Sequence, residues 1–309
     1  MTFTASAPGK LIVLGEHAVV YGKPAVALAI DKRITCTLST ADETTLNGKV
    51  FEAEKHPYLK HMMTRTKNRV RIVTESGIPP GSGLGSSAAL CTSFLKALSA
   101  LDGADVSERE LAAAAFETEY TVQGRASPLD TSASTHGMGI VVNGPEDSGE
   151  YLWDISKEDR KWTVRNLRVP EMTFVVGYTG LHAPTGPLVE KVRKYKDKTG
   201  FATDIVNEIG DITVDGIGAL RRNDVTKLGD LMTKDHKLLS ILGVSCKELN
   251  KLVNASMKYS YGAKLTGAGG GGSMVALTDE PEKVCESITL HGGRPFVIRT
   301  GQPGAKLME

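Results

Sequence analysis

The sequence predicts an α+β protein with two lobes. Three observations lead to this fold class. Short strands rich in β-branched residues crowd the first third of the chain, a glycine-rich loop at 79–87 separates a strand from a helix, and helices dominate after residue 172. The balance of strand and helix signals changes between about 160 and 172. We therefore expect an N-terminal lobe over 1–168 and a C-terminal lobe over 169–309.

The N-terminal lobe is expected to begin with short strands within residues 3–30, interrupted by turns at Ala7-Pro8-Gly9 and around 21–24. Further strands are predicted over 34–38, 70–74 and 137–142. Helices are predicted over 87–101 and from Ser107 toward Gln123, since Ser107 and Glu110 have the spacing of a capping box. The segment 145–160 is polar, so we expect it to be peripheral.

The C-terminal lobe is expected to begin with one strand, over 172–177. Helices are predicted over 187–199, 203–221 and 224–242, and another from Ser245, where Glu248 has capping-box spacing. Two strands, 263–266 and 273–277, flank a run of glycines. A helix over 282–291 and a strand near 295–299 complete the prediction.

The composition favours an ordinary globular protein. The 309 residues carry 37 basic and 36 acidic side chains, a formal net charge of +1, which gives no electrostatic footprint for nucleic acid or a membrane surface. The four cysteines show no CxxC or zinc-ligand spacing, so free thiols in a reducing compartment are expected. No signal-peptide pattern or apolar stretch of about 20 residues is present. These observations predict a cytoplasmic protein.

The loop at 79–87 is the strongest local signal of chemistry. Glycine lets a backbone approach phosphate oxygens closely, and the N-terminus of the following helix favours an anion. The loop fits neither the Walker P-loop nor GxGxxG, because Gly81, Gly83 and Gly85 stand two residues apart. A phosphate site is favoured, and a glycine-rich turn with two serines capping a helix is the alternative.

The run at 267–272 contains four consecutive glycines between two apolar strands. Glycine in an ordered segment costs roughly 0.5–1 kcal/mol per residue relative to alanine, so such a run needs a reason. We favour close approach of a ligand or of another backbone segment over a flexible hairpin.

Four charged residues and a histidine are ambiguous taken singly. Phosphoryl transfer needs an acid for Mg²⁺ and usually a second acid for the attacking hydroxyl. Glu119 and Asp130 could serve, although acids near helix ends are usually solvated. Lys10 and Glu16 bracket an apolar strand, where a cation could neutralise phosphate charge. His17 taken alone is more often a structural histidine than a ligand.

Together these segments resemble the superfamily of galactokinase, homoserine kinase, mevalonate kinase and phosphomevalonate kinase (GHMP kinases). Three motifs occur in the family's order and span almost the whole chain: 7–10, 80–88 and 266–272. Within the superfamily, residues 15–25 resemble the mevalonate kinases, and the compact length with 54–58 is similar to their archaeal form. The resemblance implies an N-terminal lobe like ribosomal protein S5 domain 2, a ferredoxin-like C-terminal lobe, and ATP-dependent phosphorylation of mevalonate to 5-phosphomevalonate.

The resemblance also implies a role for each residue that matches a family motif. ATP would bind the loop Pro80, Gly81, Ser82, Gly83, Leu84, Gly85, Ser86, Ser87 and Ala88, with Ser86, Ser87 and Glu119 holding Mg²⁺. Asp130 would be the catalytic aspartate, paired with Lys10. The substrate would contact Lys10, Glu16, His17, Asp130, Thr185 and Ala268. A homodimer is expected by the same analogy.

Two departures from the family pattern stand out. The segment Ala126-Ser127-Pro128-Leu129 lacks a glycine common before the catalytic aspartate, and Ser273 replaces a common cysteine. The loop before Asp130 could therefore differ in conformation. The alternatives are a related kinase acting on phosphomevalonate or homoserine, an ATP-using decarboxylase of the mevalonate branch, and a non-catalytic small-molecule sensor on the same fold.

Overall fold

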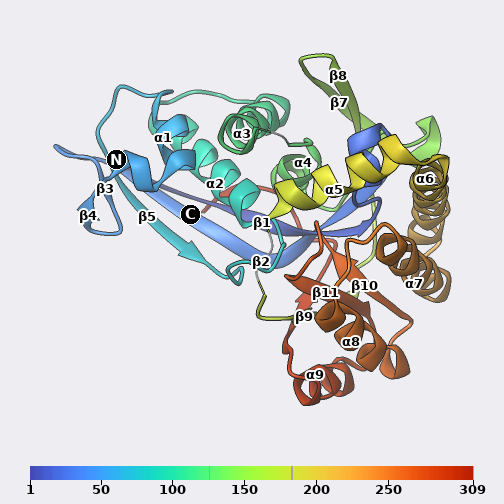
Figure 1. Ribbon diagram of the computed structural model, residues 1–309. Helices are drawn as coiled ribbons and strands as arrows, with labels where there is room; N and C mark the ends of the chain where they lie inside the picture. The colour runs from blue at the N-terminus through green and yellow to red at the C-terminus, as the bar shows by residue number, and fades with distance from the viewer. Residues whose placement is uncertain (125, 182–183, 309) are drawn as a thin grey trace.

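Two β-sheets organise the fold (Figure 1). The computed structural model describes residues 1–124, 126–181 and 184–308, and for Thr185 it describes the backbone alone. Within the described residues the larger sheet has nine strands and the smaller one four. Helices α1 to α4 lie over one face of the larger sheet, and α7, α8 and α9 pack against the smaller sheet. The predicted α+β class is confirmed.

The larger sheet is built mainly from the N-terminal half of the chain. Its strands follow the order β4-β3-β5-β2-β6-β8-β7, and β1 pairs with both β2 and β13. The last strand therefore returns to the sheet in which the chain begins. The strands are β1 (Thr2–Leu14), β2 (Ala25–Thr40), β3 (Thr45–Leu46), β4 (Lys49–Val50), β5 (Val70–Ser76), β6 (Gly139–Val142), β7 (Glu150–Lys157), β8 (Arg160–Leu167) and β13 (Lys306–Met308).

Strand β1 corrects the prediction of a turn at Ala7-Pro8-Gly9. The strand runs straight through these residues, and its register with β2 shifts between Pro8 and Lys10. Because proline cannot donate to the ladder, such an irregularity accommodates it inside a long strand. A Cβ on Gly9 would lie 2.6 Å from the Leu84 carbonyl oxygen, so this glycine lets the loop before α2 approach β1 closely.

The helices of the N-terminal half hold that loop in place. They are α1 (Pro57–Met63), α2 (Ser86–Leu101), α3 (Glu108–Gln123) and α4 (Leu129–His136). The predicted capping box is confirmed, because Ser107 Oγ accepts from the Glu110 N–H and the Glu110 carboxylate accepts from the Ser107 N–H. Helix α4 and the hairpin of β7 and β8 were not predicted. That hairpin forms one edge of the larger sheet, so the segment is peripheral as expected.

The smaller sheet has the order β10-β11-β9-β12. One predicted feature of its lobe is wrong: Ser245 caps no helix. Helix α8 begins at Lys247 with Cys246 as its N-cap, and Ser245 Oγ donates instead to Asn250 Oδ1 at 2.6 Å. The elements are β9 (Thr173–Tyr178), β10 (Gly262–Thr266), β11 (Ser273–Leu277), β12 (Arg294–Arg299), α5 (Thr185–Lys198), α6 (Gly200–Arg221), α7 (Val225–Ile241), α8 (Lys247–Ser256) and α9 (Pro281–Leu290).

The two sheets share one hydrophobic core. Leu11 and Leu14 of β1 belong to the same buried cluster as Leu239 of α7 and Leu265 of β10. This shared core fixes the end of β1 against β10, the strand that leads into the glycine run. The division of the chain at 168 and 169 stays a prediction.

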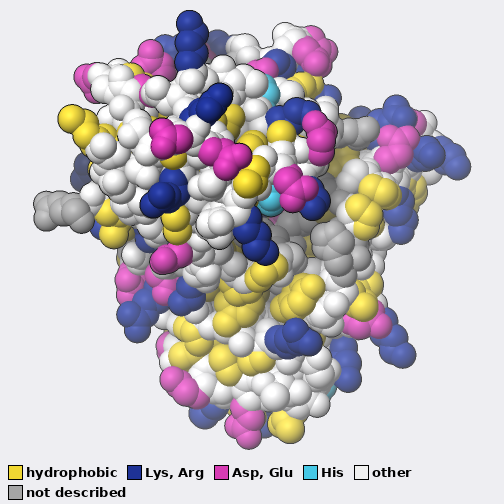
Figure 2. All heavy atoms as spheres, turned by 90° about the vertical axis from the view of Figure 1, so that its left-hand side faces the viewer, with side chains coloured by type: hydrophobic (Ala, Val, Ile, Leu, Met, Phe, Trp, Pro, Cys, Tyr) yellow, Lys and Arg dark blue, Asp and Glu magenta, His cyan; other side chains and the backbone are white. Residues whose placement is uncertain are grey.

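The surface agrees with the near-zero net charge. Figure 2 shows acidic and basic side chains interspersed over one face of the molecule. No helix of the described residues is long and apolar enough to cross a membrane. All four cysteines are free, with Cys36 and Cys91 buried and Cys246 and Cys285 half-buried.

Candidate active site

Lys10 and Asp130 meet at the centre of the candidate site. Lys10 comes from β1 and Asp130 from the first turn of α4, and Lys10 Nζ lies 3.1 Å from Asp130 Oδ2. The Lys10 side chain is 4% exposed and the Asp130 side chain 29%. A nearly buried cation thus holds a carboxylate that a ligand can still reach.

Lys10 also holds the glycine-rich loop. Its Nζ donates to the Gly83 carbonyl at 3.1 Å, and its backbone N–H donates to the Leu84 carbonyl at 2.9 Å. A Cβ on Gly85 would lie 2.8 Å from Lys10 Cγ, so the lysine stem passes directly over this glycine. One side chain therefore sets the position of both the aspartate and the loop.

The loop presents backbone N–H groups more than side chains. Gly81, Gly83 and Gly85 have φ of 70°, 75° and 74°, so every second residue is in the left-handed region that favours glycine. Gly85 is the N-cap of α2 and supplies no side-chain cap. The first N–H groups of α2 are left for a ligand, and a helix N-terminus of this kind favours an anion. The Ser82 hydroxyl donates to the Pro79 carbonyl at 2.7 Å, and Leu84 is buried.

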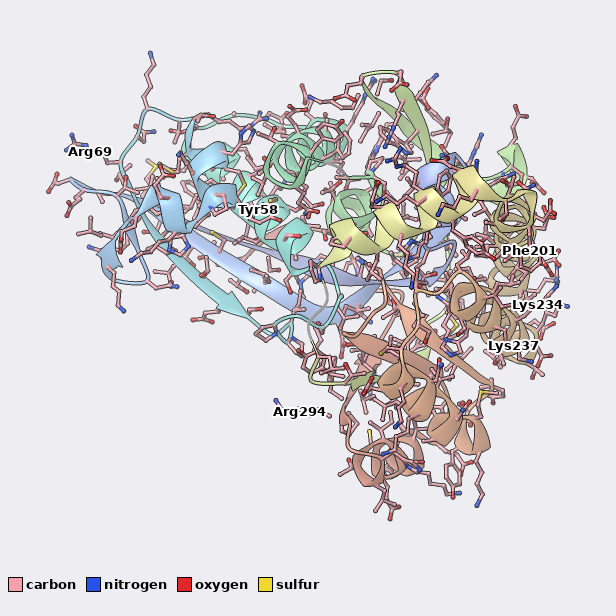
Figure 3. All side chains as sticks on the ribbon, viewed as in Figure 1. Tyr58, Arg69, Phe201, Lys234, Lys237 and Arg294 are labelled. Atoms are coloured by element: carbon pink, nitrogen blue, oxygen red, sulfur yellow. The ribbon has the colours of Figure 1, made fainter. Side chains whose placement is uncertain are left out.

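Ser87 and Glu119 form a second polar pair. Ser87 Oγ donates to Glu119 Oε1 at 2.5 Å, and Gln123 Nε2 donates to the same oxygen at 3.4 Å. Burial, and then the charge of Asp130, raise the pKa of Glu119 to about 7, although the Ser87 hydrogen bond and Lys10 oppose the shift. Tyr58 of α1, labelled in Figure 3, is a neighbour of this pair that no sequence pattern indicated, and its hydroxyl accepts from Gln123 Nε2 at 3.0 Å.

A magnesium ion fits this pair by its chemistry. The described residues contain no group of three or more histidine, cysteine and acidic side chains that could hold a metal. Mg²⁺ needs no such cluster, because it binds through one or two carboxylates together with phosphate oxygens and water. A buried carboxylate that is hydrogen-bonded to a hydroxyl, beside a helix N-terminus that favours an anion, supplies hard oxygen ligands of this kind.

The raised pKa of Glu119 predicts a pH-dependent stability of the ligand-free protein. A carboxyl whose folded pKa lies above its unfolded value stabilises the fold below about pH 4.5 and loses that contribution as pH rises through about 7. A pKa raised from 4.5 to about 7 corresponds to a loss of roughly 3 kcal/mol. We expect the unfolding free energy of the wild type to fall relative to Glu119→Gln between pH 5 and pH 8. Urea denaturation of both proteins at both pH values measures this. An unfolding free energy that changes equally in the wild type and in Glu119→Gln would contradict the prediction.

The glycine run makes close backbone contacts, as favoured over a flexible hairpin. The Gly270 N–H donates to the Val244 carbonyl at 2.7 Å, and the Gly272 N–H donates to the Leu181 carbonyl at 2.8 Å. A Cβ on Gly269 would lie 2.0 Å from the Val244 oxygen. The run is therefore a fixed turn at the edge of the smaller sheet.

Substituting Gly269 should destabilise the protein more than substituting Gly267. Both have positive φ, 82° and 77°, but a Cβ on Gly267 meets nothing within 4 Å. Gly267→Ala adds only backbone strain, about 1–3 kcal/mol, whereas Gly269→Ala must also displace the Val244 carbonyl. We expect a clearly lower melting temperature for Gly269→Ala than for Gly267→Ala. Equal melting temperatures would show that the run yields easily.

Glu16 and His17 lie where β1 leaves the larger sheet, and both contact the C-terminal lobe. His17 Nε2 lies 2.9 Å from the Ala268 carbonyl, so Nε2 carries the proton and donates, and Nδ1 of the neutral ring is an acceptor. Burial lowers the pKa of His17, which favours this neutral form. Glu16 Oε1 accepts from Lys264 Nζ, and both side chains are buried. Their contact with a substrate stays a prediction.

Lys264 and its second partner, Asp235 of α7, were not among the residues predicted from the sequence. Lys264 is fully buried in β10, with Nζ 3.2 Å from Asp235 Oδ2. One signal could have found it. Lysine within the apolar strand predicted over 263–266 needs a buried acid, because an isolated buried charge is very costly.

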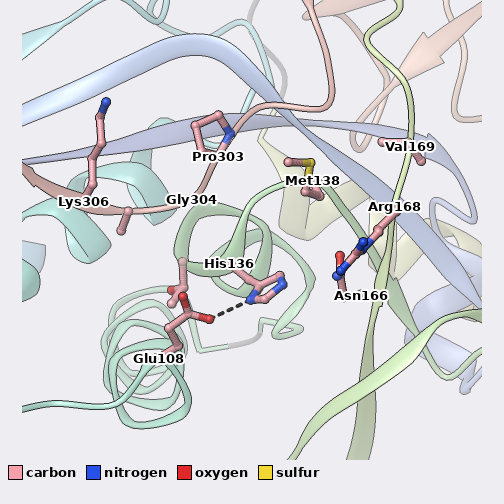
Figure 4. Close-up of a pocket in the computed structure, with 11 residues that line it drawn as sticks. Glu108, His136, Met138, Asn166, Arg168, Val169, Pro303, Gly304 and Lys306 are labelled. Carbon is pink, nitrogen blue, oxygen red and sulfur yellow. Dashed lines mark hydrogen bonds and ion pairs between the residues drawn. The ribbon is translucent and has the colours of Figure 1, made fainter.

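Thr185 begins α5, and its side chain lies outside the described part of the structure. A hollow of about 650 Å³, lined by Glu108, His136 and Arg168 among others, lies at the opposite end of α4 from Asp130 (Figure 4). There His136 Nδ1 and Glu108 Oε2 are 2.6 Å apart. This hollow is separate from the site around Lys10.

Comparison with known proteins agrees with this geometry. Residues 52–138 match the family described as the GHMP kinases N terminal domain, and residues 217–292 match the GHMP kinases C terminal family. The chain belongs to the GHMP kinases. The expected superfamily is therefore confirmed, and with it the class of enzyme, a kinase.

The named relatives are mevalonate kinases. That of Pyrococcus furiosus is 32% identical, covering 100% of this chain and 99% of its own, and that of Methanothermobacter thermautotrophicus is 37% identical, covering 89% and 90%. A crystal structure of L. major mevalonate kinase in complex with R-mevalonate superposes with a TM-score of 0.82 at 26% identity, covering 96% of this chain and 95% of that one. The Methanococcus jannaschii mevalonate kinase gives 0.80 at 26% identity, covering 97% and 98%.

Proposed function

We propose that the protein transfers the γ-phosphoryl group of ATP to a hydroxyl of mevalonate, giving 5-phosphomevalonate for isoprenoid biosynthesis. The observation that carries this proposal is the Lys10–Asp130 pair, 3.1 Å apart, from which Lys10 also reaches the Gly83 carbonyl of the glycine-rich loop. The names of the relatives, and the R-mevalonate bound to the L. major enzyme, support mevalonate as the acceptor.

Asp130 acts on the acceptor hydroxyl. Its partly exposed carboxylate accepts a hydrogen bond from the hydroxyl, orients it toward the γ-phosphorus, and takes its proton as the new P–O bond forms and the bond to ADP breaks. Lys10 forms an ion pair with the same carboxylate and stabilises the negative charge on the attacking oxygen. Positioning and electrostatics therefore supply most of the rate.

The nucleotide is bound by the loop over 80–88. Its alternating glycines and the N-terminus of α2 present N–H groups to the phosphates. Glu119, Ser86 and Ser87 would hold Mg²⁺, which when bound neutralises phosphate charge. Glu119 must be deprotonated for this, and Mg²⁺ favours that form even though burial disfavours it.

The acceptor would lie between the two lobes. Lys10 and Asp130 would hold its reacting hydroxyl, and Glu16, His17, Ala268 and Thr185 would surround the remainder. Glu16 Oε2 is buried and lacks a hydrogen-bond partner among the described residues, so it can accept from a substrate hydroxyl. We also propose a cytoplasmic homodimer with lobes divided at 168 and 169, which the family resemblance supports.

A substrate panel tests the proposed function. Purified protein is incubated with Mg·ATP and, separately, with mevalonate, phosphomevalonate, homoserine and galactose, while ADP release and product mass are measured. Turnover confined to mevalonate, with a monophosphate product, is expected. Turnover of another acceptor instead would refute the assignment of Glu16 and His17 to mevalonate while retaining the kinase.

A further inference from the structure

We infer that Lys264, held between Glu16 and Asp235, is a positioning residue that fixes the substrate end of the site by joining the two lobes. The inference deepens the proposed function and rests on it. Lys264 itself touches neither the loop over 80–88 nor the Lys10–Asp130 pair in the contacts of the described residues.

The cluster joins three separate parts of the chain. Glu16 follows β1, Asp235 lies in α7, and Lys264 lies in β10. The Lys264 and Asp235 side chains are 0% exposed and the Glu16 side chain is 2% exposed. Buried charges are retained only where they are paired, and breaking such a pair leaves an uncompensated charge. Each acid therefore holds the lysine, and the lysine holds the end of β1 against β10.

Two acid–histidine dipeptides, Glu16-His17 and Asp235-His236, hold β10 and the glycine run that follows it. Beyond Glu16, His17 Nε2 donates to the Ala268 carbonyl at 2.9 Å. Beyond Asp235, His236 Nδ1 accepts from the Leu265 N–H at 3.2 Å. Both acids contact Lys264, while both histidines hold backbone on its C-terminal side. Lys264 therefore holds both acids, and the histidine beside each acid makes a further contact near the predicted substrate residues.

His17 shows why an anchor is needed. Its φ is 60° and its ψ is −43°, and the Ala18 N–H donates to the Glu16 carbonyl across it at 2.7 Å, so His17 is the central residue of a rare and strained γ-turn. Such a conformation persists only where the surroundings hold it. The Lys264–Glu16 contact on one side and the Ala268 contact on the other supply that constraint. Without the lysine, His17 should no longer be held against the Ala268 carbonyl at the start of the glycine run.

The two acids are not equivalent. One lysine faces two carboxylates, so the cluster carries an excess negative charge. Burial, and then the charge of Glu16, raise the pKa of Asp235 to about 7, although Lys264 opposes the shift. Asp235→Asn keeps the shape and removes the excess charge, leaving the Lys264–Glu16 pair intact. Lys264→Met removes the anchor and leaves both acids uncompensated.

The test compares the effect of each substitution on KM for mevalonate with its effect on KM for ATP. Steady-state kinetics are measured for the wild type, Lys264→Met, Asp235→Asn and the control Val284→Ala, which creates a cavity at a fully buried position of α9. For Lys264→Met we expect KM for mevalonate to rise about tenfold or more while KM for ATP changes less than about twofold. Asp235→Asn should keep both KM values within about threefold. Val284→Ala should lower the melting temperature without separating the two KM values.

Two outcomes would overturn the inference: unchanged KM values in Lys264→Met, or an equal rise in both. If Lys264→Met does not fold, Lys264→Met combined with Asp235→Asn, which removes one buried negative charge together with the cation, is judged by the same criterion. Failure of the proposed function is distinguishable, because it appears in the wild type as absent turnover of mevalonate. The KM separation is then read with whichever acceptor of the panel the wild type phosphorylates.

Discussion

Replacing Asp130 with asparagine is expected to lower kcat by about 10³-fold, within the range of roughly 10²–10⁴ for a positioned general base. Asparagine has nearly the same shape but cannot take the proton of the acceptor hydroxyl. The substitution also removes the negative charge that holds Lys10 Nζ at 3.1 Å. Affinity for Mg·ATP should stay within about threefold, because the loop contacts of Lys10 to Gly83 and Leu84 remain.

A matched control makes this prediction specific. Asp230→Asn changes an exposed aspartate on α7 and should leave kcat unchanged within error. Single-turnover measurements with each variant, and titration with a fluorescent ATP analogue, give the chemical step and nucleotide binding separately. An Asp130→Asn enzyme with more than about a tenth of wild-type kcat would exclude Asp130 as the base.

Replacing Lys10 with methionine is expected to lower kcat by about 10²–10³-fold and also to raise KM for ATP. Both effects follow from one position, because Lys10 Nζ contacts Asp130 Oδ2 and the Gly83 carbonyl, each at 3.1 Å. Methionine keeps the length of the stem that passes over Gly85 but lacks the charge. This combination distinguishes Lys10 from Asp130, whose replacement should lower kcat while the affinity for Mg·ATP stays within about threefold.

The control for Lys10 is another lysine paired with an acid. Lys32 Nζ lies 3.4 Å from Asp31 Oδ2 on β2, and both side chains are partly exposed. Exposed ion pairs contribute about 0–1 kcal/mol, so Lys32→Met should leave kcat and both KM values near those of the wild type. A Lys10→Met variant that behaved like Lys32→Met would reduce Lys10 to a structural role.

Local sequence patterns predicted most of the elements, and the failures have physical causes. Helix α4 escaped prediction because its eight residues are mostly small and polar, with Leu129 as its one large apolar side chain. Packing against β1, β2, α2 and α3 stabilises it instead. The hairpin of β7 and β8 reads as polar, although Trp153 and Trp162 are buried on one of its faces.

The residues of the site also differ in how far the sequence could predict them. The glycine-rich loop is contiguous in sequence, so its glycine spacing predicts its backbone without tertiary information. Lys10 and Asp130 are 120 residues apart in the chain, and the family motifs, not any local pattern, brought them together. Lys264 and Asp235 belong to a cluster formed by three distant segments. Only the structure shows that the lysine is buried and which acids surround it.

We propose that Asp130 and Lys10 direct the γ-phosphoryl group of ATP straight to mevalonate. The most direct test is a rapid-quench single turnover with ATP carrying a radioactive γ-phosphate, Mg²⁺ and mevalonate, with wild type and Asp130→Asn run in parallel. We expect the label to pass to mevalonate as a monophosphate in the wild type, without labelled protein, and about 10³-fold more slowly in the variant. Label on the protein before the product, or equal rates in the two proteins, would contradict it.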